Sequence, residues 1–85
     1  PLNFEDVVAQ AEKSVCRIQA TGIGGGSGFL IDTDVIMTNR HVVDCMLVDE
    51  IEVSFPNNPS ISNSKLSAKI IYEAPKLDVA ILRVP

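Results

Sequence analysis

The first apolar residues of the chain follow a helical spacing. Four of them fall at positions i, i+3, i+4 and i+7, which places them along one stripe of a helix: Phe4, Val7, Val8 and Ala11. Asn3 is a favourable N-cap, and acidic Glu5 in the first turn suits the positive end of a helix. The pattern predicts a helix over residues 3–13 that packs as a strut on the rest of the domain.

From Ser14 onward apolar and polar positions alternate with the period of two that is typical of half-buried strands. The alternation predicts six short strands, over residues 14–20, 28–31, 35–38, 50–55, 66–73 and 79–84. Between them we expect a glycine-rich turn at 21–28, a hairpin turn at 32–34, a helical turn at 39–44 and a loop at 56–64. Short strands separated by turns favour an all-β fold, and a closed antiparallel barrel of six strands leaves no exposed strand edges.

Composition narrows the class of protein. Hydrophobic residues make up 46% of the chain, which excludes a disordered segment, and the absence of Trp predicts an aliphatic core. The net charge of -4 argues against nucleic-acid binding, which normally needs a basic face. No apolar run approaches the roughly 18 to 20 residues of a membrane span.

The two ends of the chain bear on its organisation. The sequence starts with Pro1, and it stops at Pro85 directly after a predicted strand. We therefore expect an N-terminal helix over residues 1–13, a barrel over residues 14–85, and a functional unit that continues beyond Pro85.

All five glycines fall between positions 22 and 28, a run that imitates several motifs. A P-loop needs a Lys, and there is none between Arg17 and Arg40. A dinucleotide fingerprint must open a helix, but a strand is predicted to follow this run. A nucleophile elbow needs Gly two positions before and after the Ser; Gly25 satisfies this for Ser27, but Phe29 does not. Ser27 is therefore not expected to be a nucleophile.

His41 and Asp78 are the candidate site residues. His41 is the only histidine, and it follows a strand that ends at Thr38, while Asp78 precedes the last strand. A histidine that acts as a general base needs a carboxylate to orient it and set its tautomer. We therefore expect the Asp78 carboxylate to approach the Nδ1 side of the His41 ring.

Three strings around these residues resemble the chymotrypsin-fold serine peptidases, and most closely their HtrA/Deg-like and bacterial trypsin-like branch. They are GSGFLI at 26–31, IMTNRHVV at 36–43 and LDVAIL at 77–82. The resemblance extends over residues 14–84 and implies the first lobe of a double β-barrel. It also implies that His41 is the general base and Asp78 its orienting partner, in an endopeptidase that hydrolyses proteins or peptides without a metal or other cofactor.

One part of the family pattern is absent from these 85 residues. The resemblance places the serine nucleophile and the oxyanion-hole glycines in a second lobe, and no Gly-Asp-Ser-Gly-Gly string occurs here. We therefore expect the chain to be inactive alone. We also expect it to require a C-terminal lobe as its partner and to self-associate through the uncovered face when that lobe is missing.

The two cysteines leave several interpretations open. Secreted members of the family often have a disulfide beside the histidine, but here Val42 follows His41 and the nearest cysteine is Cys45. We expect Cys16 and Cys45 to be free thiols, which favours the cytoplasm over secretion. A metal site or a nucleophilic Cys45 beside His41 is disfavoured because neighbours on one helical turn leave no cleft and no further ligands cluster nearby.

Three other functions remain compatible with parts of the sequence. A non-catalytic pseudoprotease could retain this fold, and a cysteine peptidase could place a Cys in the second lobe. An unrelated small barrel that binds ligands or peptides would leave the strings around His41 and Asp78 unexplained. The residue at the nucleophile position would decide between the first two and a serine peptidase.

Overall fold

One antiparallel sheet forms the body of the molecule. The computed structural model describes residues 3–20, 23–44 and 51–85. Within these ranges the elements are α1 (Phe4–Ser14), β1 (Val15–Ala20), β2 (Ile23–Leu30), β3 (Val35–Thr38), α2 (Arg40–Val43), β4 (Ile51–Ser54), β5 (Leu66–Ser67), β6 (Lys69–Glu73) and β7 (Ala80–Arg83). The strands pair in the order β5-β4-β1-β2-β3-β7-β6.

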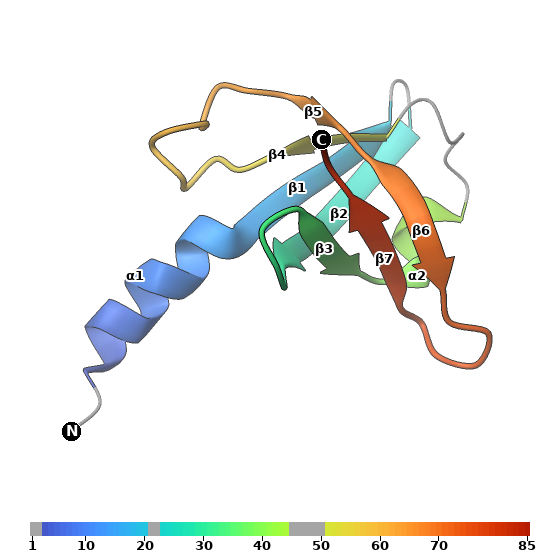
Figure 1. The fold of residues 1–85 in the computed structure, drawn as a ribbon, viewed down its shortest axis with the longest axis horizontal. Helices are drawn as coiled ribbons and strands as arrows, with labels where there is room; N and C mark the ends of the chain where they lie inside the picture. The colour runs from blue at the N-terminus through green and yellow to red at the C-terminus, as the bar shows by residue number, and fades with distance from the viewer. Residues whose placement is uncertain (1–2, 21–22, 45–50) are drawn as a thin grey trace.

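The sheet curls into a nearly closed barrel because its two edge strands are consecutive in the chain (Figure 1). β5 pairs with β4, and β6 pairs with β7. Ala68 lies between them, and its N–H donates to the carbonyl of Ile51 at 3.0 Å. The predicted all-β barrel is confirmed. The single strand predicted over 66–73 is divided at Ala68, which accounts for seven strands in place of six.

The interior of the barrel is aliphatic, as the composition predicts. The eight largest fully buried side chains are those of Phe55, Ile18, Ile36, Ile51, Leu82, Val43, Val53 and Cys16. Most come from alternate positions of β1, β3, β4 and β7, so each of these strands buries one face. Val43 belongs to α2, and its burial attaches this short helix to the core.

The glycine run forms part of a strand, so the turn predicted over residues 21–28 is wrong across its described part. Thr21 and Gly22 lie outside the described residues, but β2 begins at Ile23. Close packing is the physical reason. A Cβ on Gly26 would lie 2.6 Å from Val42 Cγ2, and a Cβ on Gly28 would lie 2.8 Å from the Met37 carbonyl oxygen. The glycines thus let α2 and β3 approach β2.

Helix α1 begins and ends close to the predicted positions. The side chain of Asn3 caps it by accepting hydrogen bonds from the N–H groups of Glu5 (3.1 Å) and Asp6 (3.4 Å). The helix projects away from the barrel (Figure 1), and none of its residues is buried. The expectation that it packs as a strut on the barrel is therefore wrong: Phe4 is 73% exposed and Val8 is 54% exposed. Neither helix in the described ranges has the length and apolarity needed to cross a membrane.

Replacing Gly28 with Ala is expected to destabilise the barrel. The added Cβ would meet the Met37 carbonyl oxygen and also lie 2.9 Å from Ile18 Cδ1 and 3.0 Å from Ile36 Cγ2. Overpacking of this kind costs about 1–3 kcal/mol. The free energy of unfolding in urea measures the effect, and Ser27→Ala, at an exposed position on the same strand, is the control. Equal stability of Gly28→Ala and the control would contradict the prediction.

Candidate active site

The pairing of β3 with β7 brings the two candidate residues together. The strands are antiparallel, with Thr38 opposite Ala80. The end of β3 and the beginning of β7 therefore lie at the same end of the barrel. His41 follows β3 on α2, and Asp78 lies two residues before β7. A separation of 37 positions in the chain thus becomes a direct contact.

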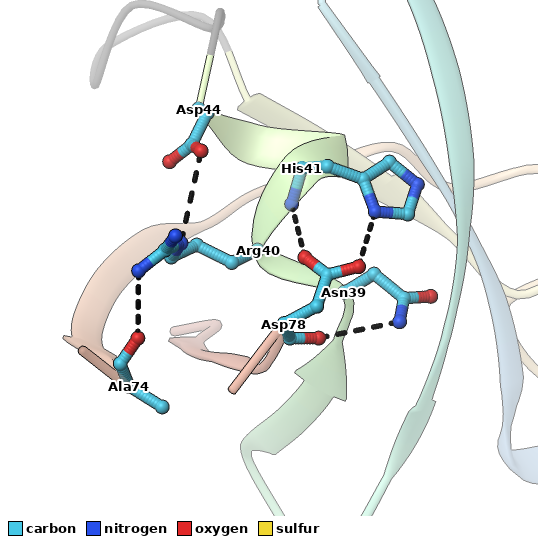
Figure 2. Close-up of polar contacts among 6 residues, drawn as sticks. All are labelled: Asn39, Arg40, His41, Asp44, Ala74 and Asp78. Atoms are coloured by element: carbon cyan, nitrogen blue, oxygen red, sulfur yellow. Dashed lines mark hydrogen bonds and ion pairs between the residues drawn. The ribbon is translucent and has the colours of Figure 1, made fainter. Parts of the chain in front are cut away.

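Both oxygens of the Asp78 carboxylate contact His41 (Figure 2). The backbone N–H of His41 donates to Asp78 Oδ1 at 2.7 Å. The second oxygen, Oδ2, forms a hydrogen bond with Nδ1 of the His41 ring. Two contacts to one residue fix the carboxylate and the ring relative to each other. The contact has the geometry expected from the sequence for an orienting carboxylate.

The second ring nitrogen of His41 points away from Asp78 (Figure 2). The His41 side chain is 70% exposed, so this nitrogen is open to a group outside the described residues. In a neutral imidazole one nitrogen carries the proton and the other accepts a hydrogen bond. The Asp78 carboxylate favours the tautomer with the proton on Nδ1, which leaves Nε2 as the acceptor.

Asp78 is held in its ionised form. Its pKa is lowered from the ordinary value of 3.8, first by the hydrogen bond from the His41 backbone N–H and second by the bond to the His41 ring. Hydrogen bonds donated to a carboxylate favour the charged form. Asp78 is therefore a carboxylate at neutral pH and can stabilise a positive charge on the neighbouring imidazole.

Two further side chains join the segment before His41 to the loop that carries Asp78. Asn39 Nδ2 donates to the Asp78 carbonyl at 3.2 Å, and Arg40 Nη1 donates to the Ala74 carbonyl at 2.8 Å (Figure 2). Nothing in the sequence by itself selects either residue for a role at the site. Their position directly before His41 was the one available signal, and it does not reveal which loop they contact.

α2 rests on β2 through close contacts. Val42 lies against the surface left free by Gly26, and Thr38 Oγ1 donates to the Ser27 carbonyl at 2.8 Å. These contacts fix the turn from β3 into α2. Ser27 itself lies inside β2, away from any strand-to-helix turn of the nucleophile-elbow type.

The cysteines stand apart from this contact where they are described. Cys16 is a free thiol that is 1% exposed. Burial raises its pKa to about 11, so it is a poor nucleophile. Cys45 lies outside the described residues. The free thiol expected at Cys45, and the interpretations of Cys45 as a metal ligand or a nucleophile, concern a residue outside the described ranges. Among the side chains that the structure describes, no group of three His, Cys, Asp or Glu residues is arranged to hold a metal ion.

Comparison with known proteins gives consistent results. Residues 26–85 match the family described as trypsin-like peptidase domain. The chain is 38% identical over 85 residues to a protein of Rickettsia conorii named as a probable periplasmic serine endoprotease, DegP-like, with 99% of this chain and 14% of that protein covered. It is 34% identical over 86 residues to the serine protease Rv3671c of Mycobacterium tuberculosis, with 93% of this chain and 19% of that protein covered.

A solved structure agrees with these sequence matches. The crystal structure of the Rv3671c protease in an inactive form superimposes with a TM-score of 0.71 at 35% sequence identity, covering 93% of this chain and 36% of that chain. The chain spans less than a fifth of the length of the two relatives from Rickettsia conorii and Mycobacterium tuberculosis that match it in sequence. The resemblance to chymotrypsin-fold serine peptidases is confirmed, and the chain belongs to the trypsin-like peptidase family.

Proposed function

We propose that this chain is the first barrel lobe of a serine endopeptidase, in which His41 is the general base and Asp78 its orienting carboxylate. The observation that carries the proposal is the double contact of the Asp78 carboxylate with the backbone and ring of His41. On this proposal residues 1–13 are an N-terminal segment that carries most of α1, and residues 14–85 form the lobe.

The geometry supports a proton-transfer role for His41. Nε2 takes the proton of an attacking serine hydroxyl as the Oγ–carbonyl bond forms, and later gives it to the leaving amine as the peptide bond breaks. The positive charge that develops on the ring lies against ionised Asp78. Because Asp78 also accepts from the His41 backbone N–H, it holds the ring in place while the charge changes.

The nucleophile and the oxyanion donors come, on this proposal, from a C-terminal lobe of the same protein. The chain spans less than a fifth of the length of these relatives, which supports a continuation of this kind. A shallow groove that reaches Asp78 supports it further, since its lining includes Val15, Phe29 and Met37. Phe29 is 47% exposed and Val15 is 39% exposed, so a second lobe seated here would bury apolar surface beside the dyad.

The same surface supports self-association of the isolated lobe. α1 adds exposed apolar side chains next to it, because it leads directly into Val15 on β1. Exposed apolar side chains that lie together favour association with another molecule that covers them. We therefore infer that the lobe associates with itself when its C-terminal partner is absent.

The substrate is proposed to be a peptide bond in a protein or peptide, because the relatives are named as serine proteases or endoproteases. The sequence favoured the cytoplasm on the basis of its cysteines. The name of the Rickettsia conorii relative places that protein in the periplasm, so we propose export in place of a cytoplasmic location. The pseudoprotease and the cysteine peptidase are the remaining alternatives, and the reactivity of the full-length protein separates them.

Substitution of the dyad tests the proposal directly. In the full-length protein His41→Ala is expected to lower kcat by roughly 10³-fold or more with little change in KM, because the base acts mainly in the transition state. Asp78→Asn is expected to be nearly as damaging. Peptide hydrolysis at saturating substrate measures both, with Lys76→Ala, on the exposed part of the same loop, as the control. Full activity of His41→Ala would contradict the proposal.

The 85-residue chain alone is expected to be unreactive. A base and its orienting carboxylate accelerate nothing without a nucleophile and oxyanion donors. Labelling with a serine-directed phosphonate should therefore modify the full-length protein and leave the isolated lobe unmodified. Labelling of Ser27 in the isolated lobe would overturn this expectation, and an inactive full-length protein with no reactive serine would favour the pseudoprotease.

The contribution of Asp78 to stability is expected to depend on pH. Its pKa is lower in the folded protein than its ordinary value of 3.8, so ionised Asp78 stabilises the fold above that value. The stabilisation is lost as the pH falls through the lower pKa of the folded state. Urea unfolding should therefore show a difference in stability between wild type and Asp78→Asn that shrinks in acid below pH 3.8. A difference that persists unchanged in strong acid would contradict the assignment.

A further inference from the structure

Arg40 is a charged residue beside His41 and Asp78, and it takes no part in the proposed proton-transfer steps. Its Nη1 donates to the Ala74 carbonyl at 2.8 Å, and its Nε lies 3.7 Å from Asp44 Oδ2 (Figure 2). The contact with Ala74 joins two segments that are 34 positions apart in the chain. The contact with Asp44 stays within a single helical turn.

The loop that Arg40 contacts is the one that carries Asp78. It connects β6 to β7, and the N–H of Ala74 donates to the Val79 carbonyl at 2.9 Å, which closes the loop at its base. Arg40 therefore contacts the first residue of the loop, while Asn39 and His41 contact Asp78 near its other end.

The loop has little apolar packing of its own to hold it. Leu77, next to Asp78, is 67% exposed, and the residues from 75 to 78 are all exposed. Besides the buried Ala74 and the bond that closes its base, the loop is held by the polar contacts from the segment Asn39–His41. The bond from Arg40 is charge-assisted and partly buried, which makes it stronger than a bond between two neutral groups in water.

We propose that Arg40 is a positioning residue that holds the β6–β7 loop so that the Asp78 carboxylate stays aligned with His41. The inference rests on the proposed function of the dyad. A displacement of about 1 Å at such a carboxylate is enough to slow catalysis markedly, although Arg40 touches neither substrate nor the reacting atoms.

The chain provides two matched controls. Asp44→Ala removes the ion pair of Arg40 and leaves its bond to Ala74. Arg83→Ala removes an arginine whose Nε also lies 3.7 Å from a carboxylate oxygen, that of Asp34, away from the loop between β6 and β7. If Arg40 acted through an ordinary surface ion pair, Asp44→Ala would have the same effect as the loss of Arg40.

The experiment compares kcat and KM of the full-length protein and its variants. Arg40→Ala is expected to lower kcat about tenfold and to leave KM within about twofold of wild type. Arg40→Lys keeps a positively charged donor on a side chain that is one bond shorter, and should restore kcat to within about threefold of wild type. Asp44→Ala and Arg83→Ala should behave as wild type. If Arg40→Ala does not fold, Arg40→Met, which keeps the aliphatic stem and lacks the donors, replaces it with the same expectation.

A second measurement is independent of turnover. The backbone N–H of His41 donates to Asp78 Oδ1, so its amide hydrogen exchange in the full-length protein should be faster in Arg40→Ala than in wild type, with no change in Arg83→Ala. If wild type does not hydrolyse peptides, the proposed function fails, and this exchange rate still decides whether Arg40 aligns Asp78. An unchanged exchange rate, or a wild-type kcat in Arg40→Ala, would overturn the proposal.

Discussion

The antiparallel pairing of β3 with β7 is the constraint on which the candidate site depends. With Thr38 opposite Ala80, the residues that leave one strand meet the residues that enter the other. His41 and Asp78 come together because of this register. A shift of one strand by one residue relative to the other would move all its side chains to the other face of the sheet. The register is fixed by burial, because Ile36 and Leu82 pair across the two strands and are both fully buried.

The dyad is positioned by the barrel and remains open to solvent. The His41 side chain is 70% exposed and that of Asp78 is 48% exposed, so water screens the charge interaction between them. A site for peptide hydrolysis works best when water is excluded and fixed dipoles face the developing charge. On the proposed function, the described residues provide the base and its orientation, and a covering lobe would provide the low-dielectric surroundings.

The packing also leaves part of the apolar surface exposed. A domain of 85 residues buries a small core, and here the core consists of aliphatic side chains and one phenylalanine. The apolar side chains of α1 and the pair Val15–Phe29 lie outside this core. The described barrel therefore has a closed core and leaves these apolar side chains on its surface, and the chain spans a small part of the length of its relatives.

Local patterns in the sequence were sufficient for the helix at Phe4–Ser14, for most strands, for the turn that carries His41 and for the family. Each of these depends on neighbours in the chain: a cap, a period of two or 3.6, or a short string. The glycine-rich strand β2 could not be recognised in this way, because the glycines are required by Val42 and the Met37 carbonyl, which approach from elsewhere in the fold.

The remaining features also depend on distant residues. The division of the predicted strand at Ala68 follows from the change of pairing from β4 to β7. The bond from Arg40 to Ala74 joins positions 34 residues apart, and whether α1 packs on the described barrel is also decided by residues far from it in the chain. The sequence by itself determined the residue types and the local conformations, since these depend on steric and hydrogen-bonding preferences of near neighbours. Only the tertiary structure decided which side chains meet, because strand pairing sets those distances and is itself set by burial of the whole core.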